Sequence, residues 1–161
     1  MSLLKNIYNR FTRQASGNVA ATTRESMPKA VNGALFVRIE NYLHESKRYL
    51  DKDISRTTLA GELKTNENYL AKAIRKGAGM TVNEYINSLR IAYACALLSD
   101  PAGNTRIAKI AAESGFNNRI SFYRSFVGKY GISPGEYRKL APKTGAGGRK
   151  WIKKIKLITR N

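Results

Sequence analysis

The chain of 161 residues has one cysteine and one histidine. A single cysteine, Cys95, excludes an internal disulfide and a cysteine-rich metal site. Because it lies in the apolar run IAYACALL, we predict that it is a small core residue. The lone His44 has no second histidine, no cysteine partner and no paired carboxylates at a useful spacing. We therefore predict no metal, no cofactor and no enzymatic activity.

Long apolar runs are also missing. None approaches the ~20 residues that are needed to cross a bilayer. The N-terminal sequence MSLLKNIYNRF is too short and too polar for a signal peptide. We therefore expect a cytoplasmic protein.

Acidic residues are scarce, since 11 Asp and Glu stand against 29 Lys and Arg and leave a net charge of +18. The excess is greatest per residue at the two ends of the chain. Residues 1–35 carry five basic residues and one acid, residues 36–140 carry 17 and ten, and residues 141–161 carry seven and none. A charge of this size predicts a polyanionic partner.

Two segments of the chain repeat one pattern. The first begins at Leu59 and reads LAGELKTNENYLAKAIRKGAGMTVNEY, and the second begins at Ile110 and reads IAAESGFNNRISFYRSFVGKYGISPGEY. Matching residues are 51 positions apart before the turn and 52 apart after it, so the second copy has one extra residue in or beside its turn. Each copy predicts a short helix, a tight turn and a second helix. Two such units predict two reading heads for DNA.

Helical periodicity predicts an all-α chain of about seven helices and no strand. Residues 1–34 are interpreted as a basic flexible linker, because small and polar residues are broken there by Gly and Pro. Residues 35–140 are predicted to form the DNA-binding domain. Within it we expect a first helix-turn-helix unit at about 35–80, a linker helix at about 81–100 and a second unit at about 104–140.

Capping residues set the expected helix ends. Five helices of the domain have candidates at their ends: Ser55 or Thr57 before the first short helix, Asn66 before the next helix with Gly77 and Gly79 after it, Thr81 before the linker helix, Asn104 or Thr105 before the following helix, and Ser133 with Pro134 before the last. The linker helix is expected to bury one apolar face: Val82, Tyr85, Ile86, Leu89, Ala92 and Ala96. The second recognition helix is expected at 118–129, ended by Gly131.

The basic tail at 141–161 differs from the rest. Gly145, Gly147 and Gly148 are interpreted as a hinge, and the segment beyond them is basic and amphipathic. Such a segment suits a phosphate backbone, an anionic membrane or a partner groove, and it is also compatible with a disordered cationic tail. The residues predicted to contact a DNA backbone are Arg149, Lys150, Lys153, Lys154 and Lys156.

The second unit carries the pattern I-A-x-x-x-G-F, then an aromatic-rich helix, then G-x-S-P-x-x-Y-R. In this chain the residues that match the pattern are Ile110, Ala111, Gly115, Phe116, Phe122, Arg124, Phe126, Gly131, Ser133, Pro134, Tyr137 and Arg138. With this pattern, residues 36–140 resemble the DNA-binding domain of the arabinose-regulator (AraC/XylS) family of bacterial transcription regulators. The resemblance implies two helix-turn-helix subdomains joined by a long linker helix. It also implies a sequence-specific regulator that inserts two recognition helices into successive major grooves, about 34 Å apart.

The outward faces of the two recognition helices carry the predicted DNA contacts. The candidate base contacts are Asn68, Ala71, Lys72, Arg119, Ile120, Tyr123 and Arg124. The candidate phosphate contacts are Asn66, Arg75, Lys76, Ser121 and Lys129. Arginine suits guanine, Asn68 suits adenine, and Ile120 with the ring of Tyr123 suits a thymine methyl group.

Two departures from the family pattern lead to expectations. Lys64 stands where the family usually has glycine in the first turn, so a left-handed lysine there costs on the order of 1 kcal/mol. Val127 and Gly128 replace the basic residues that often end the second recognition helix, so we expect fewer phosphate contacts at that end.

Double-stranded DNA is the expected partner, and RNA polymerase is a further candidate partner of a regulator. We expect a monomer by itself, and no small-molecule effector bound within this chain. Either the chain is a portion of a larger regulator, or it is a stand-alone regulator that is controlled by abundance. The alternatives are a non-specific architectural DNA-binding protein, or a cationic protein that binds a membrane surface through its tail.

Overall fold

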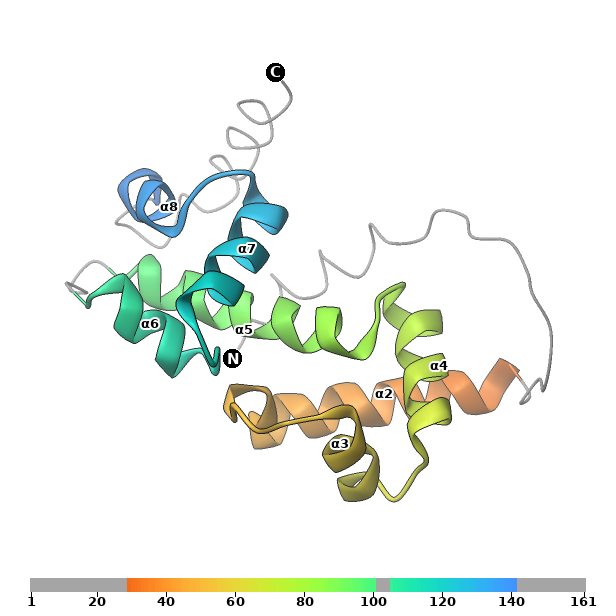
Figure 1. The fold of residues 1–161 in the computed structure, drawn as a ribbon. Helices are drawn as coiled ribbons and strands as arrows, with labels where there is room; N and C mark the ends of the chain where they lie inside the picture. The colour runs from red at the N-terminus through yellow and green to blue at the C-terminus, as the bar shows by residue number, and fades with distance from the viewer. Residues whose placement is uncertain (1–28, 101–104, 142–161) are drawn as a thin grey trace. The chain divides into compact units, whose positions relative to one another are not determined.

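The computed structural model describes residues 29–100 and 105–141 (Figure 1). In these ranges the chain forms seven α-helices, one short 3-10 helix and no strand. Their bounds are Lys29–Ser46 (α2), Arg48–Leu50 (η1), Arg56–Glu62 (α3), Glu67–Ala78 (α4), Val82–Leu98 (α5), Ile107–Glu113 (α6), Arg119–Tyr130 (α7) and Pro134–Leu140 (α8). The all-α prediction is therefore confirmed. Of the linker predicted at 1–34, residues 1–28 lie outside the described residues and residues 29–34 belong to α2 instead. Most of the tail also lies outside the described residues.

The helices form two compact units that divide within α5, between Leu89 and Arg90. In the first unit α2 packs along α4, and α3 packs against α4. Its buried apolar side chains come from α2 (Phe36, Ile39, Leu43), α3 (Leu59, Ala60), α4 (Leu70, Ala73, Ile74, Ala78) and the start of α5 (Val82, Tyr85, Ile86). The inward positions predicted for Leu70 and Ile74 are confirmed, since neither side chain is exposed.

The second unit is built on aromatic rings. Phe122 and Phe126 of α7 are fully buried, and Phe126 lies 5.7 Å from Phe122, 5.1 Å from Tyr130 and 5.2 Å from Tyr137 between ring centroids. The rest of the buried cluster comes from α5, α6, the turn after α6, α8 and the residue that follows it: Ile91, Ala94, Cys95, Leu98, Ile110, Ala111, Phe116, Tyr137 and Ala141. Burial raises the pKa of the Cys95 thiol to about 11, in keeping with its predicted role in the core.

The predicted apolar face of α5 is only half correct. Val82, Tyr85 and Ile86 are buried as expected, but Ala96 is exposed. The second half of the helix instead buries another stripe: Ile91, Ala94, Cys95 and Leu98. The reason is that each half of α5 belongs to a different core, whereas a single stripe serves one core.

The two helix-turn-helix turns share one hydrogen-bond pattern. In the first, the Lys64 amide donates to the Gly61 carbonyl (3.0 Å) and the Thr65 amide donates to the Ala60 carbonyl (2.9 Å). In the second, the amide of Gly115 donates to Ala112 (3.0 Å) and that of Phe116 donates to Ala111 (3.2 Å), each 51 positions further along.

The residue at the equivalent point of each turn has a positive φ, 47° at Lys64 and 82° at Gly115. Lysine therefore adopts the left-handed conformation that the sequence predicted. The caps of the following helices, Asn66 and Asn118, are 52 positions apart, which identifies Asn117 as the extra residue of the second turn.

Most of the predicted caps are confirmed, with one ambiguity resolved and one correction. Ser55, not Thr57, caps α3, and Ser133 caps α8 with Pro134 as the first helical residue. Thr81 precedes α5, and its amide donates to the carboxylate of Glu84 (2.8 Å). The cap position of α6 is Arg106, which makes no side-chain capping bond, so the prediction of Thr105 is wrong and Asn104 lies outside the described residues.

Two helix bounds also differ from the prediction. α2 begins at Lys29, six residues before Leu35, and it includes Gly33. A glycine in a helix interior costs about 1 kcal/mol relative to alanine, which tertiary packing readily offsets. Gly77 does not end α4 but lies inside it, and the left-handed cap is Gly79, with a φ of 71°. Gly77 has a packing role instead, because a Cβ at this position would overlap the ring of Phe36.

We expect Gly77→Ala to lower the free energy of unfolding by about 1–3 kcal/mol, because the added methyl group displaces the Phe36 ring from its site on α4. Gly61→Ala is the matched control, since Gly61 is also helical and has open space at its Cβ position. That control is expected to gain up to about 1 kcal/mol from helix propensity. Urea unfolding followed by circular dichroism measures both. Equal effects of the two substitutions would contradict the close approach of α2 to α4.

Candidate nucleic-acid interface

The buried residues of α4 determine which of its residues face outward. Because Leu70 and Ile74 are fully buried, Asn68 and Lys72 are exposed on the opposite side of the helix. Ala71 is half-buried between them. The predicted base contacts of the first unit therefore lie together on one side of one helix.

The predicted phosphate contacts of α4 lie at its two ends. Arg75 and Lys76 are exposed in the last turn. Asn66 stands at the N-terminus, where its side-chain oxygen accepts a hydrogen bond from the Tyr69 amide (2.8 Å). Since that oxygen caps the helix, the amide nitrogen is the group of Asn66 that is suited to a phosphate.

An ion pair that the sequence did not predict holds α3 to α4. The carboxylate of Glu67, the first residue of α4, accepts hydrogen bonds from the hydroxyl of Thr57 and from Nε of Arg56, both 2.6 Å long. The bond from Thr57, and then that from Arg56, lower the pKa of the Glu67 carboxyl below its ordinary value. The pair leaves the only acid of α4 bound to a cation, which limits its repulsion of a phosphate.

The outward face of α7 has a different character. Ile120 is 71% exposed and Val127 is 43% exposed, while Arg119 and Arg124 are exposed beside them. The guanidinium carbon of Arg119 lies 5.1 Å from the centre of the Tyr123 ring. Such a cation–π contact is worth about 0.5–1 kcal/mol at an exposed site, so it favours one orientation of the ring.

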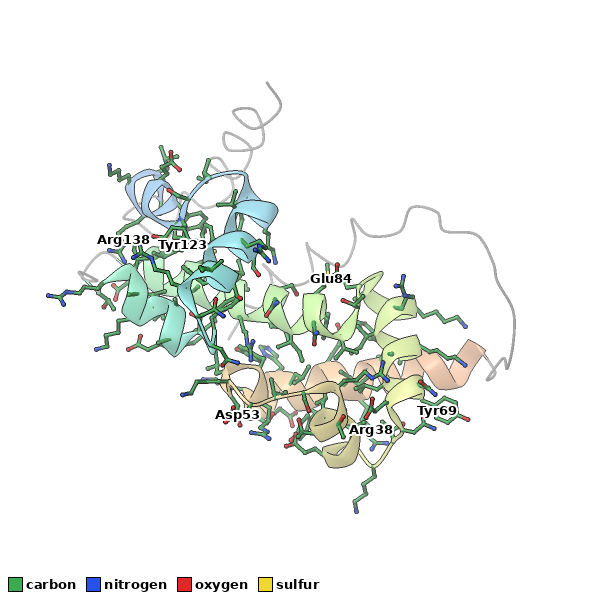
Figure 2. All side chains as sticks on the ribbon, in the orientation of Figure 1. Arg38, Asp53, Tyr69, Glu84, Tyr123 and Arg138 are labelled. Atoms are coloured by element: carbon green, nitrogen blue, oxygen red, sulfur yellow. The ribbon has the colours of Figure 1, made fainter. Side chains whose placement is uncertain are left out.

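An open hollow of ≈ 420 Å³ lies on this face of α7. Among the described residues, its lining comes from the helix itself: Arg119, Ile120, Tyr123, Arg124 and Val127. Figure 2 shows Tyr123 on α7, among the side chains of the second unit. The structure thus brings together all four predicted base contacts of the second unit and adds Val127, which the sequence marks only as a position without the usual cation.

The remaining predicted contacts divide into three groups. Ser121 is exposed, and its amide donates to the capping oxygen of Asn118 (2.8 Å). Lys129 is half-buried, and desolvation lowers the pKa of its ammonium group to about 8, so it is less suited to bind phosphate than the exposed cations. The predicted tail contacts lie outside the described residues: Arg149, Lys150, Lys153, Lys154 and Lys156.

Two further arginines brace the second unit without lying on α4 or α7. The guanidinium of Arg138 donates to the Thr105 carbonyl (2.6 Å), which ties α8 to the start of α6 (Figure 2). Arg90 is buried, and its guanidinium carbon lies 5.6 Å from the centre of the Phe116 ring. Arg138 is part of the sequence motif, but the sequence carries no signal for either contact, because the partners lie 33 and 26 positions away.

The structure also tests for a metal site and for a membrane-spanning helix. In the part of the chain that the structure describes, no three His, Cys, Asp or Glu side chains are grouped so as to hold a metal ion. Among the same residues, no helix combines the length and the apolar character that a membrane span requires.

Comparison with known proteins identifies relatives of this arrangement. A family described as "Helix-turn-helix domain" matches residues 59–140. The melibiose operon regulatory protein of Escherichia coli (strain K12) is 37% identical over 92 residues, which make up 56% of this chain and 30% of that protein. The chain thus matches less than a third of that relative's length.

Two solved structures extend the likeness to the fold. The C-terminal domain of the two-component response regulator yesN from Fusobacterium nucleatum matches with 27% identity and a TM-score of 0.56, covering 65% of this chain and 98% of that chain. A transcriptional regulator from Chromobacterium violaceum, described by its AraC-type DNA-binding domain, matches with 18% identity and a TM-score of 0.58. This second match covers 70% of this chain and 99% of that chain, and at its identity it is a likeness of fold alone.

Proposed function

The chain belongs to the helix-turn-helix domain family, of the arabinose-regulator (AraC) type, and from this membership we propose that it is a sequence-specific transcription regulator of double-stranded DNA, or the DNA-binding portion of one. The observation that carries the proposal is the pair of turns with the same hydrogen-bond pattern and a positive φ at the equivalent residue, each followed by a helix with an exposed outward face. The resulting arrangement has two reading helices, α4 and α7.

In this proposal α4 and α7 enter successive major grooves of one duplex, about 34 Å apart, so that a monomer reads a long and non-palindromic site. Lys72 and Arg124 occupy equivalent positions on the two helices and are both exposed. Arginine bonds the O6 and N7 of guanine together, and asparagine bonds adenine, so Arg124 and Asn68 are assigned to base edges. Arg75, Lys76, Ser121 and the tail cations are assigned to phosphates, which fix position without reading sequence.

Regulation completes the proposal. A protein that occupies an operator acts in the cytoplasm and meets RNA polymerase there. The proposal for this chain therefore includes a cytoplasmic location and RNA polymerase as a further partner. The net charge of +18 favours one other function, that of an architectural protein which binds all duplexes through phosphates. Selection of bound duplexes from a random pool, at one stated salt concentration, separates the two, because only a sequence-specific regulator enriches a defined site.

Arg124→Ala is expected to weaken binding to the selected site by ~1–3 kcal/mol and to relax the preference at one or two adjacent base pairs. Competition binding against duplexes mutated at each position measures both effects. Arg106→Ala is the matched control, because Arg106 is also exposed but lies at the start of α6 rather than on a reading helix. An equal loss of affinity on random DNA would make Arg124 a phosphate contact.

A further inference from the structure

An apolar strip runs along the outward face of α7. It consists of Ile120, Tyr123 and Val127, which recur at spacings of three and four residues and therefore share one side of the helix. Ile120 is 71% exposed and Val127 43% exposed, while Tyr123 is half-buried. The strip forms the apolar part of the hollow on α7.

The core of the unit does not require Ile120 or Val127, which are exposed, whereas Tyr123 also packs against the core. The inward face of α7 already supplies Phe122 and Phe126, both fully buried. Exposed large apolar side chains that cluster on one face of a small domain mark a site for a ligand or a partner.

The first unit provides an internal comparison, because residues 52 positions earlier occupy the same places on α4. The equivalents of Ile120, Tyr123 and Val127 are Asn68, Ala71 and Arg75. At these three positions α4 therefore has an amide, a small methyl group and a guanidinium, whereas α7 has three large side chains with mainly apolar surface. A shared fold does not dictate this difference, so it reflects what each helix contacts.

The borders of the strip identify the chemistry of its partner. Arg119 and Arg124 are exposed on either side, and no acid occurs in α7. A partner that is anionic at its rim and apolar at its centre complements this pattern. The major groove of DNA matches, because phosphates line its edges and the thymine 5-methyl group is the apolar feature of its floor.

Resting on the proposed function, we infer that α7 recognises thymine 5-methyl groups through Ile120, Tyr123 and Val127, whereas α4 reads polar base edges. The half-site under α7 contains thymines whose methyl groups meet the strip. The half-site under α4 is read by hydrogen bonds from Asn68 and Lys72. Beside the guanine contact that is assigned to Arg124, the half-site under α7 is thus read through a large apolar surface that α4 lacks.

The test replaces thymine by deoxyuridine in a selected duplex, because this change removes the methyl group and leaves the hydrogen-bonding edges intact. Each half-site is first assigned to its helix. The base pairs at which Lys72→Ala relaxes the base preference lie under α4, and those at which Arg124→Ala relaxes it lie under α7. Burial of one methyl group is worth ~0.8 kcal/mol, or about fourfold in affinity. Replacing two contacted thymines under α7 should therefore weaken binding by about 15-fold, while the same replacement under α4 should change binding less than twofold.

Ile120→Ala is the matched variant. Because the Ile120 side chain is highly exposed, we expect this variant to fold normally, and circular dichroism checks that it does. This variant should discriminate between the thymine and deoxyuridine duplexes less than the unsubstituted chain does, because Tyr123 and Val127 remain. Equal binding of both duplexes by the unsubstituted chain would overturn the inference, even though enrichment of a defined site still supported the proposed function. Failure to enrich any site would instead count against the proposed function itself. If Ile120→Ala disrupts binding of RNA polymerase and leaves the deoxyuridine effect unchanged, the strip contacts a protein and the inference is also overturned.

Discussion

Phe126→Ala is expected to lower the free energy of unfolding of the second unit by about 3–5 kcal/mol. Phe126 is fully buried and contacts the rings of Phe122, Tyr130 and Tyr137. Its removal leaves a cavity among the rings of α7 and α8 that the helices cannot close without moving. Natural domains are stable by only about 5–15 kcal/mol in total. Urea unfolding followed by circular dichroism measures the loss.

Val127→Ala is the control for this substitution, because Val127 is the next residue of the same helix and is 43% exposed. Its effect on stability is expected to stay within about 0.5 kcal/mol. Comparable losses for the two variants would mean that the inward and outward faces of α7 have been assigned wrongly. The DNA-reading role of α7 depends on that assignment.

Removal of residues 142–161 is expected to flatten the dependence of log affinity on log salt. Ala141 is retained, because it is buried in the core of the second unit. The removed segment carries seven basic residues and no acid. Each phosphate that it neutralises adds about 0.9 to the slope, so the slope should fall by several units, up to about six. The preferred sequence should not change, since phosphates carry no base identity.

A variant in which the seven Lys and Arg residues of the tail are replaced by Gln keeps its length and its apolar residues. If charge alone acts, this variant and the truncation should have the same slope. An unchanged slope in both would show that the tail does not bind the DNA backbone. A changed preferred sequence would show that the tail enters a groove and reads bases.

The sequence was most informative where structure is set by neighbouring residues. The two turns, the capping Asn66, and the inward Phe122 and Phe126 all follow from local periodicity and hydrogen bonding, and the structure confirms them. A single residue inserted between matching copies was enough to predict where the second turn is longer.

The sequence was least informative where distant segments meet. The sequence predicts Gly77 as a helix terminator, because the contact with the ring of Phe36, which explains this glycine, is visible only in the structure. One helix that serves two cores changes its buried face midway, and a search for one stripe therefore placed Ala96 inward when it is exposed. The bonds of Glu67 to Arg56 and of Arg138 to Thr105 depend on tertiary geometry that no local pattern encodes.

The two faces also show why residue type alone did not define the site. Val127 was interpreted only as an absent cation, because family patterns record what is usual at a position. In the structure Val127 is exposed beside Ile120 and is not part of the core, so its apolar side chain is available for a contact with a partner. Comparison of α4 with α7 then turned a departure from the pattern into a prediction about the partner.

The central claim is that α4 and α7 read base sequence rather than phosphate alone. The most direct test is the ratio of two dissociation constants of the full chain at one salt concentration, one for the selected duplex and one for a scrambled duplex of the same length and base composition. A sequence-specific regulator should prefer its site by about 10³-fold or more. A ratio near one would contradict the claim and assign the binding to the +18 charge of the chain alone.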